Sequence, residues 1–334
     1  MSDVKEKVYL YGNGNNLRRS WEFLIGNYQI LGIIDRKHNE LAFNAQGIPL
    51  YNPSQLNDLD KNVKVIITCV YVAEIKALLA GLGFTRIEHI FGLREDEHFC
   101  FHKYNAFDEI YYNDVRALLF DDESKYIFDK ILQFRKNGAY DYNEICSNEP
   151  QYFPESVYVL GNEEIMIDAG AFIGDTIERF RKVTNNKFKK IYAFEPCQEN
   201  YDKLLLKTNN DARIDCLLYA VWDCEQELGF AESGYSGYID NDKSNATIKT
   251  IPIDKIIKSP VTFIKMDVEG AELRALQGAK GLIEKYHPKL AVSLYHKEKD
   301  IYQIPLYLHS KYPEYKFALR HHGKQWLETV LYAY

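Results

Sequence analysis

The sequence predicts an α/β protein with two sheets, a smaller N-terminal one and a larger C-terminal one. Two stretches, residues 1–97 and 151–334, alternate short apolar runs with helix-like segments. Apolar strands alternating with helices are typical of a parallel sheet covered on both faces. Residues 98–150 between them contain helical patterns and no strand-like run, so we interpret them as a helical connector. The residues are 46% hydrophobic and 27% charged, the balance of a globular protein with a core.

The N-terminal stretch predicts a small Rossmann-like domain. Its expected strands are "KVYLYG", "YQILGIIDR", "VKVIITC" and "RIEHIFG", with helices "LRRSWEFLIG" and "VAEIKALLAGLGF". The loop "YGNGNN" provides Gly12 and Gly14, and Asp35 ends the next strand, but Leu17 stands where the dinucleotide pattern has its third glycine. The domain could bind a nucleotide, such as that of a nucleotide-linked sugar. The alternative is a scaffold or oligomerisation domain, which leaves a homo-oligomer open.

The C-terminal stretch predicts a seven-stranded doubly wound sheet. Five strand–helix alternations are followed by two closing strands. The expected strands are "EIMIDAG", "KKIYAFEP", "IDCLLYAVW", "VTFIKMDVEG", "KLAVSLYH", "YKFALRHH" and "ETVLYAY". In such sheets ligands bind outside the carboxyl ends of the strands, so the strand ends hold the candidate site.

The first two strand ends predict a ligand site. "DAGAFIGDT" places Asp168 at a strand end, and Gly170 and Gly174 allow backbone to approach a ligand. The spacing differs from G-x-G-x-x-G, so the loop suits a ligand without phosphate that carries an amino acid and a nucleoside. Glu195 ends the second strand, where an acid usually holds ribose hydroxyls. The alternative is that Glu195 caps the helix that begins after Pro196.

The third strand end is a weaker candidate. Ala220, Val221 and Trp222 could flank an adenine ring, although an aromatic residue at a strand end often belongs to the core. The loop at residues 231–247, "AESGYSGYIDNDKSNAT", is rich in Gly, Ser, Asn and Tyr. It is expected to be a mobile lid that selects the substrate, or an ordinary surface loop.

The fourth strand ends in a group of carboxylates, "FIKMDVEGAE". Asp267 lies at the strand end in the expected cleft, and Lys265 shares its strand face and could pair with a buried carboxylate. Glu272 is interpreted as a first-turn acid that stabilises the next helix. The role of Glu269 stays open between the helix dipole, a metal and the substrate.

Four segments in this order resemble the FkbM family of S-adenosylmethionine-dependent methyltransferases: "EIMIDAGAFIGDTIERF", "YAFEP", "IPIDKI" and "FIKMDVEGAELRALQGA". The resemblance covers about residues 152–334, and "DVEGAE" with the downstream "LQGA" is its most specific part. It implies a class I methyltransferase fold, S-adenosylmethionine as cofactor, and O-methylation of a sugar or nucleotide-linked sugar. The cofactor contacts expected from the strand ends and this resemblance are Asp168, Gly170, Ala171, Gly174, Asp175, Thr176, Glu195, Pro196, Ala220, Val221, Trp222 and Asp267.

Asp267 and His296 are the predicted catalytic residues, because they end neighbouring strands. A hydroxyl acceptor must lose a proton, and general-base help accelerates such steps by ~10²–10⁴. His296 is the expected base, and Asp267 could orient it or hold a ligand. A less favoured alternative is a divalent metal held by Asp267, Glu269 and His296. His321 and His322 end another strand and could join either arrangement.

Composition narrows the class of protein. A net charge of −7 argues against a general nucleic-acid binder. No apolar run approaches the ~18 residues of a membrane span, and the N-terminus has no signal-peptide layout, so a cytoplasmic location is expected. The six cysteines form no CxxC, which favours reduced thiols over a zinc site. The alternatives in function are an NAD(P)-dependent oxidoreductase and a non-catalytic sugar-nucleotide-binding protein.

Overall fold

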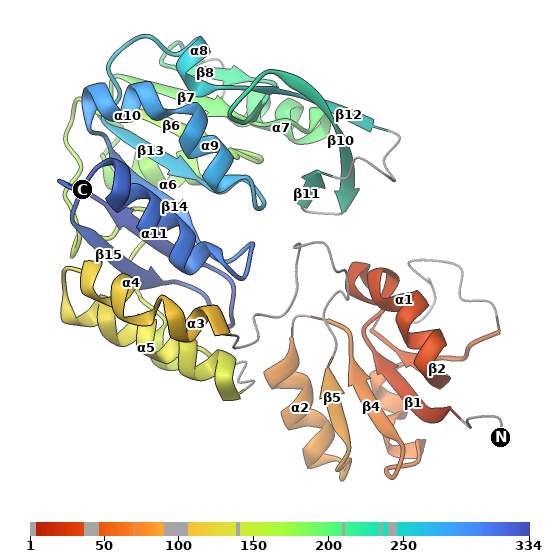
Figure 1. Ribbon diagram of the computed structural model, residues 1–334. Coiled ribbons are helices and arrows are strands. Elements are labelled where there is room, and N and C mark those ends of the chain that lie inside the picture. Colours follow the sequence, from red (N-terminus) through yellow and green to blue (C-terminus); the bar gives the residue numbers. More distant parts are fainter. Residues whose placement is uncertain are drawn as a thin grey trace. The chain divides into compact units, whose positions relative to one another are not determined.

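The chain divides into two compact units, Met1–Lys103 and Tyr104–Tyr334 (Figure 1). The computed structural model describes residues 5–36, 47–69, 71–89, 106–137, 141–208, 211–233, 236–239 and 246–334. Within these ranges, every helix is too short or too polar to cross a membrane.

The first unit is a five-stranded parallel sheet with the strand order β3-β2-β1-β4-β5. Its elements are β1 Glu6–Tyr11, α1 Asn15–Asn27, β2 Tyr28–Ile34, β3 Leu50–Tyr51, η1 Pro53–Asp58, β4 Lys64–Ile67, α2 Val72–Gly81 and β5 Ile87–His89. Leu17 and Leu24 of α1 pack on Val8, Leu10 and Ile33 of the sheet, which explains the apolar pattern of these segments. The prediction missed β3, because a strand of two residues shows no periodicity.

The glycine loop after β1 is held by its own sheet. The Gly12 amide donates to the Ile34 carbonyl at 2.8 Å, and the Asn13 amide donates to Asp35 Oδ2 at 2.7 Å. Gly12 has a φ of +115°, and a Cβ there would lie 2.9 Å from the Cβ of Cys69. Packing alone therefore requires Gly12, and nucleotide binding by this unit stays a prediction.

The second unit is built on a seven-stranded mixed sheet, and seven strands were predicted; their order is β15-β16-β14-β13-β6-β7-β8. Its strands are β6 Ile165–Ala169, β7 Lys190–Phe194, β8 Ile214–Leu217, β13 Phe263–Met266, β14 Lys289–Ser293, β15 Phe317–His321 and β16 Thr329–Ala333. All neighbours are parallel except β16, which is antiparallel to both β14 and β15. The strand order reverses direction between β6 and β13, so a crevice is expected at their carboxyl ends.

Helices cover both faces of this sheet (Figure 1). They are α6 Asp175–Val183, α7 Gln198–Thr208, α8 Ile253–Ile256, α9 Glu272–Gly278, α10 Lys280–Tyr286 and α11 Asp300–Lys311. Phe180 of α6 and Leu204 of α7 pack in one cluster with Met166, Ile191 and Phe263 of the strands. Burial on both faces explains why β13 and β16 are apolar along most of their length.

The helices of the expected connector pack within the second unit. They are α3 Ala106–Ile110, α4 Tyr112–Leu118 and α5 Asp122–Asn137, and η2 Asn143–Ile145 follows them. The Phe120 amide donates to the Phe317 carbonyl at 2.8 Å, and the Leu319 amide donates to Ser124 Oγ at 2.8 Å. Figure 1 shows α4 and α5 beside β15. Residues 104–150 therefore belong to the same compact unit as the large sheet.

A second, four-stranded sheet of the order β11-β10-β12-β9 corrects two predictions. Its strands are β9 Ala220–Val221, β10 Gln226–Ser233, β11 Ser236–Ile239 and β12 Ala246–Ile251. The expected third strand "IDCLLYAVW" is split, because β8 stays in the large sheet while β9 pairs with β12. In the expected loop at 231–247, the described residues 231–233, 236–239 and 246–247 are β-strand. Residues 234–235 and 240–245 lie outside the described ranges. Polar residues interrupt the apolar runs in these strands, so the sequence did not indicate them as strands.

Candidate active site

The loop after β6 crosses the end of β13. Gly170 has a φ of +78°, and a Cβ there would lie only 1.9 Å from the Asp267 carbonyl oxygen. Gly174 has a φ of +84° and is the N-cap residue of α6. As a glycine it has no side chain that could accept a hydrogen bond from the first N–H groups of the helix. The Ala171 amide donates to the Phe194 carbonyl at 2.8 Å. Gly170 is therefore required because the backbones of two strand ends meet here.

A buried ion pair lies beneath this loop. Lys265 Nζ lies 3.0 Å from Asp168 Oδ1 and donates to the Gly170 carbonyl at 2.6 Å. Burial raises the pKa of Asp168. Burial alone would lower the pKa of Lys265, but the charges of Asp168 and Asp267 outweigh it and raise that pKa. The predicted pairing of Lys265 with a carboxylate is confirmed, and Asp168 Oδ2 has no hydrogen-bond partner among the described residues.

Glu195 ties the loop after β6 to the start of α7. Its Oε2 accepts from the Phe172 amide at 2.9 Å, and its Oε1 accepts from the Cys197 amide at 3.0 Å. Burial raises its pKa, and the two N–H donors oppose that rise. The contact with Cys197 agrees with a capping role. A carboxylate oxygen can accept more than one hydrogen bond, so a role toward ribose stays a prediction.

The other expected cofactor contacts differ in how deeply they are buried and in what they contact. Asp175, the first residue of α6, pairs with Arg179 at 3.1 Å, and Thr176 is buried. Pro196, before α7, is partly buried. Ala220 and Trp222 pack against a small core cluster under the second sheet, and Val221 of β9 is buried. Trp222 thus has a core role of its own, and its contact with an adenine ring stays a prediction.

Asp267 lies directly after β13, where two tyrosines hold its carboxylate. Tyr152 donates to Oδ2 at 2.8 Å, and Tyr295 donates to Oδ1 at 2.9 Å. Burial would raise the pKa of Asp267, but Lys265 and the histidine ring of residue 296 keep it below its ordinary value. Asp267 is therefore an ionised carboxylate of fixed orientation at neutral pH.

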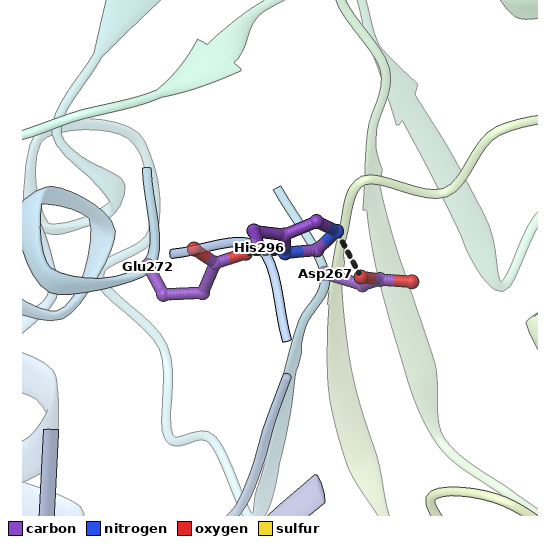
Figure 2. Close-up of side chains that lie close together, drawn as sticks. All are labelled: Asp267, Glu272 and His296. Atoms are coloured by element: carbon purple, nitrogen blue, oxygen red, sulfur yellow. Dashed lines mark hydrogen bonds and ion pairs between the residues drawn. The ribbon is translucent and has the colours of Figure 1, made fainter. Parts of the chain in front are cut away.

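His296 is surrounded by three carboxylates. Its Nδ1 lies 2.8 Å from Glu272 Oε1, while its Nε2 lies 3.4 Å from Asp267 Oδ1 and 3.6 Å from Glu269 Oε2. Figure 2 shows the ring between Glu272 and Asp267. Burial would lower the pKa of His296, but the acids, Glu272 first, raise it to about 10. In the site without ligands the ring is thus a cation at neutral pH.

Glu272 is more than the first-turn acid that the sequence suggested. Its side chain is fully buried, and its Oε1 accepts from the Val268 amide at 3.0 Å besides contacting His296. Burial and the charge of Glu272 also raise the pKa of nearby Asp300 to about 7. Glu272 therefore both holds the turn before its own helix and orients the imidazole.

His321 and His322 have partners away from Asp267. His321 Nδ1 lies 2.8 Å from Thr329 Oγ1, and His322 Nε2 lies 2.8 Å from the Tyr332 hydroxyl. Burial lowers the pKa of each to about 4. These contacts belong to the β15–β16 part of the core and suit neutral structural histidines.

His321 should therefore make stability pH-dependent. In the unfolded chain, His321 binds a proton below its ordinary pKa of 6.5. In the folded chain it binds that proton only below about pH 4, so folding is weakened between these two values. The wild type should lose stability across this window relative to His321→Asn, which cannot titrate, by on the order of 3 kcal/mol. Urea unfolding of both proteins at pH 7 and pH 4.5 measures the difference, in which the other titrating groups cancel. A difference that is independent of pH would contradict the buried neutral ring.

Two residues of the site escaped the sequence analysis. Tyr152 precedes β6 in a segment without a recognisable motif and has a φ of +70°. Its hydroxyl reaches Asp267 from 115 positions earlier in the chain. Tyr295 is adjacent to His296, and only its place at the end of β14 could have suggested a role.

The comparisons with known proteins concern the fold and the family of the second unit. The model of the methyltransferase FkbM domain matches residues 168–324. The crystal structure of methyltransferase FkbM from Methylobacillus flagellatus KT has 24% sequence identity and a TM-score of 0.75, covering 98% of this chain and 90% of that chain. At that identity the likeness shows the fold alone.

A more distant structure is an rRNA methylase from Streptococcus thermophilus. It has 16% identity and a TM-score of 0.35, covering 52% of this chain and 87% of that chain, and this score is too low to support a function. None of the curated proteins matches the sequence significantly. The match of residues 168–324 to the FkbM methyltransferase domain confirms the resemblance found in the sequence.

Proposed function

We propose that the protein is an S-adenosylmethionine-dependent O-methyltransferase that acts on a hydroxyl of a sugar or sugar-containing metabolite. The observation that carries the proposal is the meeting of three carboxylates at adjoining strand ends. Asp168 ends β6 together with its glycine loop, Glu195 follows β7, and Asp267 follows β13. The family supports methyl transfer, and the family resemblance supports a sugar hydroxyl as acceptor.

The residues at the strand ends fit the proposed cofactor. Asp168 Oδ2, buried and without a hydrogen-bond partner among the described residues, suits a cationic group such as an ammonium. The N-terminus of α6, with no side-chain cap, suits a carboxylate. Glu195 remains able to accept from hydroxyls. These three features match the amino acid and ribose parts of S-adenosylmethionine.

Asp267 and His296 are the proposed catalytic residues. When bound, the cofactor supplies an activated methyl carbon, so the protein mainly has to align the acceptor. The ionised Asp267 carboxylate can accept a hydrogen bond from the acceptor hydroxyl and hold it in place. A positive charge bound beside Asp267 and Glu269 would favour the neutral ring of His296, whose Nε2 could then accept a proton.

Cofactor binding is the first test. The wild type should bind S-adenosylhomocysteine, and its melting temperature should rise. A ligand at 100 times its Kd stabilises the folded protein by about 2.7 kcal/mol. Glu195→Gln should weaken this binding roughly 10-fold or more, since hydrogen bonds to a charged group contribute about 1.5–3 kcal/mol. Thermal unfolding measures the first effect and isothermal titration calorimetry the second, with NAD(H) as the ligand for the oxidoreductase alternative.

Glu178→Gln is the matched control for this test. Glu178 lies on α6, and its carboxylate pairs with Lys207 at 3.0 Å on the protein surface. This variant should bind S-adenosylhomocysteine like the wild type. Absence of binding by the wild type would refute the proposed cofactor. Unchanged affinity in Glu195→Gln would refute only the role of Glu195.

The acceptor is found by supplying cofactor labelled in its methyl group with a panel of nucleotide sugars and methyl glycosides. Label in an ether-linked methyl group of one panel member, lost when the Asp267 carboxylate is removed, is the expected result. Label on nitrogen, or none on any hydroxyl of the panel, would contradict a sugar O-methyltransferase.

A further inference from the structure

We propose that Asp267, Glu269 and His296 form a binding site for one divalent cation of the Mn²⁺ type. The inference deepens the proposed function and rests on it, since the ion would lie where the acceptor hydroxyl is expected. With the ion bound, Nε2 of His296 would be a ligand, and the ion would replace this nitrogen in promoting loss of the hydroxyl proton. All three residues follow the ends of the adjacent strands β13 and β14.

The distances around His296 distinguish its two nitrogens. The 2.8 Å between Nδ1 and Glu272 Oε1 is that of a hydrogen bond. The 3.4 Å and 3.6 Å from Nε2 to Asp267 Oδ1 and Glu269 Oε2 are longer than a good hydrogen bond. With metal bonds of about 2.0–2.2 Å, two ligand atoms on one ion lie roughly 3–3.6 Å apart. Each of the two carboxylate oxygens is therefore at a ligand-to-ligand distance from Nε2.

Glu272 gives the imidazole the orientation of a metal ligand. Metal-binding histidines usually donate their other ring N–H to a carboxylate, which fixes the tautomer and directs the free nitrogen to the ion. Glu272 is fully buried and held by the Val268 amide, so its position is fixed. His296 itself is only 4% exposed. Nε2 is thus buried and directed between two carboxylates, and an ion that binds there displaces the proton of this nitrogen.

The first carboxylate ligand is also held in place. Tyr152 and Tyr295 each donate to one oxygen of Asp267, as outer partners do for metal-binding carboxylates. The side chains of Asp267 and Glu269 are 25% and 33% exposed. The site is therefore open on the side from which water or an acceptor hydroxyl could complete the coordination.

A second grouping of ligands is less suitable. Asp267, Glu272 and His296 each offer an atom within 4.8 Å of the others. Glu272, however, occupies the Nδ1 side of the ring, opposite Asp267, as Figure 2 shows. One ion cannot be reached from both ring nitrogens, so Glu269 is the better third ligand and Glu272 is a positioning residue.

The ligand set indicates the type of ion. Carboxylate oxygens suit Mg²⁺, Ca²⁺ and Mn²⁺, whereas an imidazole nitrogen suits Zn²⁺ and other transition metals. Mg²⁺ prefers oxygen ligands and retains several waters. Two carboxylates with one imidazole therefore favour Mn²⁺, which accepts both kinds of ligand.

The test is a titration of Mn²⁺ into chelator-treated full-length protein, with free Mn²⁺ measured by electron paramagnetic resonance. We expect one saturable site per chain. Glu269→Gln should weaken binding at least about 10-fold, and Glu272→Gln should weaken it by about 10–100-fold. Asp267→Asn is a second ligand variant, for use if circular dichroism shows that Glu269→Gln is unfolded.

The matched control is Glu328→Gln, which removes one negative charge near Asp267 without removing a proposed ligand. It should bind Mn²⁺ within about threefold of the wild type, since only a diffuse charge effect is lost. No saturable site in the wild type, or equal weakening in Glu328→Gln and Glu269→Gln, would overturn the proposal.

Binding of S-adenosylhomocysteine to the same samples separates this inference from the proposed function. Cofactor binding without a Mn²⁺ site overturns the metal site and leaves the methyltransferase proposal intact. A Mn²⁺ site that depends on Glu269, found without cofactor binding, supports the metal site and removes the proposed cofactor.

Discussion

Asp267→Asn is expected to lower kcat by about 10²–10⁴ while the affinity for S-adenosylhomocysteine changes by less than about threefold. Asparagine keeps the size of the side chain and one acceptor for the hydroxyls of Tyr152 and Tyr295. It removes the negative charge that holds the acceptor and that faces His296 Nε2 at 3.4 Å. The loss should therefore fall on turnover and not on binding of the cofactor.

Initial rates at saturating labelled cofactor, with the best acceptor of the panel, measure the effect on kcat. Glu328→Gln again serves as control, because it lowers the charge near Asp267 without touching the carboxylate itself. Its kcat should remain within about threefold of the wild type. An Asp267→Asn protein with the wild-type kcat would remove Asp267 from the catalytic residues.

Lys265→Met is expected to reduce the free energy of unfolding of the second unit by about 3–5 kcal/mol. The substitution leaves Asp168 buried without its cation and removes the donor to the Gly170 carbonyl. Breaking a buried pair by removal of one partner is strongly destabilising, because the other charge stays in a medium that solvates it poorly. Adding Asp168→Asn to Lys265→Met should recover part of the loss.

Urea unfolding in a Trp21→Phe background reports on the second unit, since the other two tryptophans, Trp222 and Trp326, lie there. Lys190→Met is the control, because its partner Asp215 is half exposed and a pair of this kind contributes about 0–1 kcal/mol. A loss of less than about 1 kcal/mol in Lys265→Met would show that the buried pair is not important for stability.

Most strands of the large sheet and the place of the candidate site could be predicted because their signals are local. The central strands β6, β13 and β14 are buried on both faces, so each is visible as a short apolar run bounded by turns or helices. Asp168, Glu195 and Asp267 were found because each is a carboxylate directly after such a run. In a doubly wound sheet, carboxyl ends of neighbouring parallel strands meet at one edge, whatever the details of packing.

The four-stranded sheet was missed for the opposite reason. β9 has two residues, and β10 contains Gln226, Glu227 and Glu232, so neither strand resembles a buried one. Both strands pair with β12, and pairing between separate segments cannot be predicted from a local pattern. Trp222 packs on the cluster that contains Leu228 and Ile248, as in the core alternative, and its contact with an adenine ring stays a prediction.

The sequence by itself determined which chemical groups stand at the strand ends, because a strand end is defined by residues adjacent in the chain. Only the tertiary structure decided how those groups work together. Tyr152 reaches Asp267 from a distant segment, and Glu272 turns from its helix to bind His296 Nδ1 instead of facing solvent. The burial and orientation of such side chains depend on packing between segments far apart in sequence, and these contacts bring Asp267, Glu269 and Glu272 together around His296.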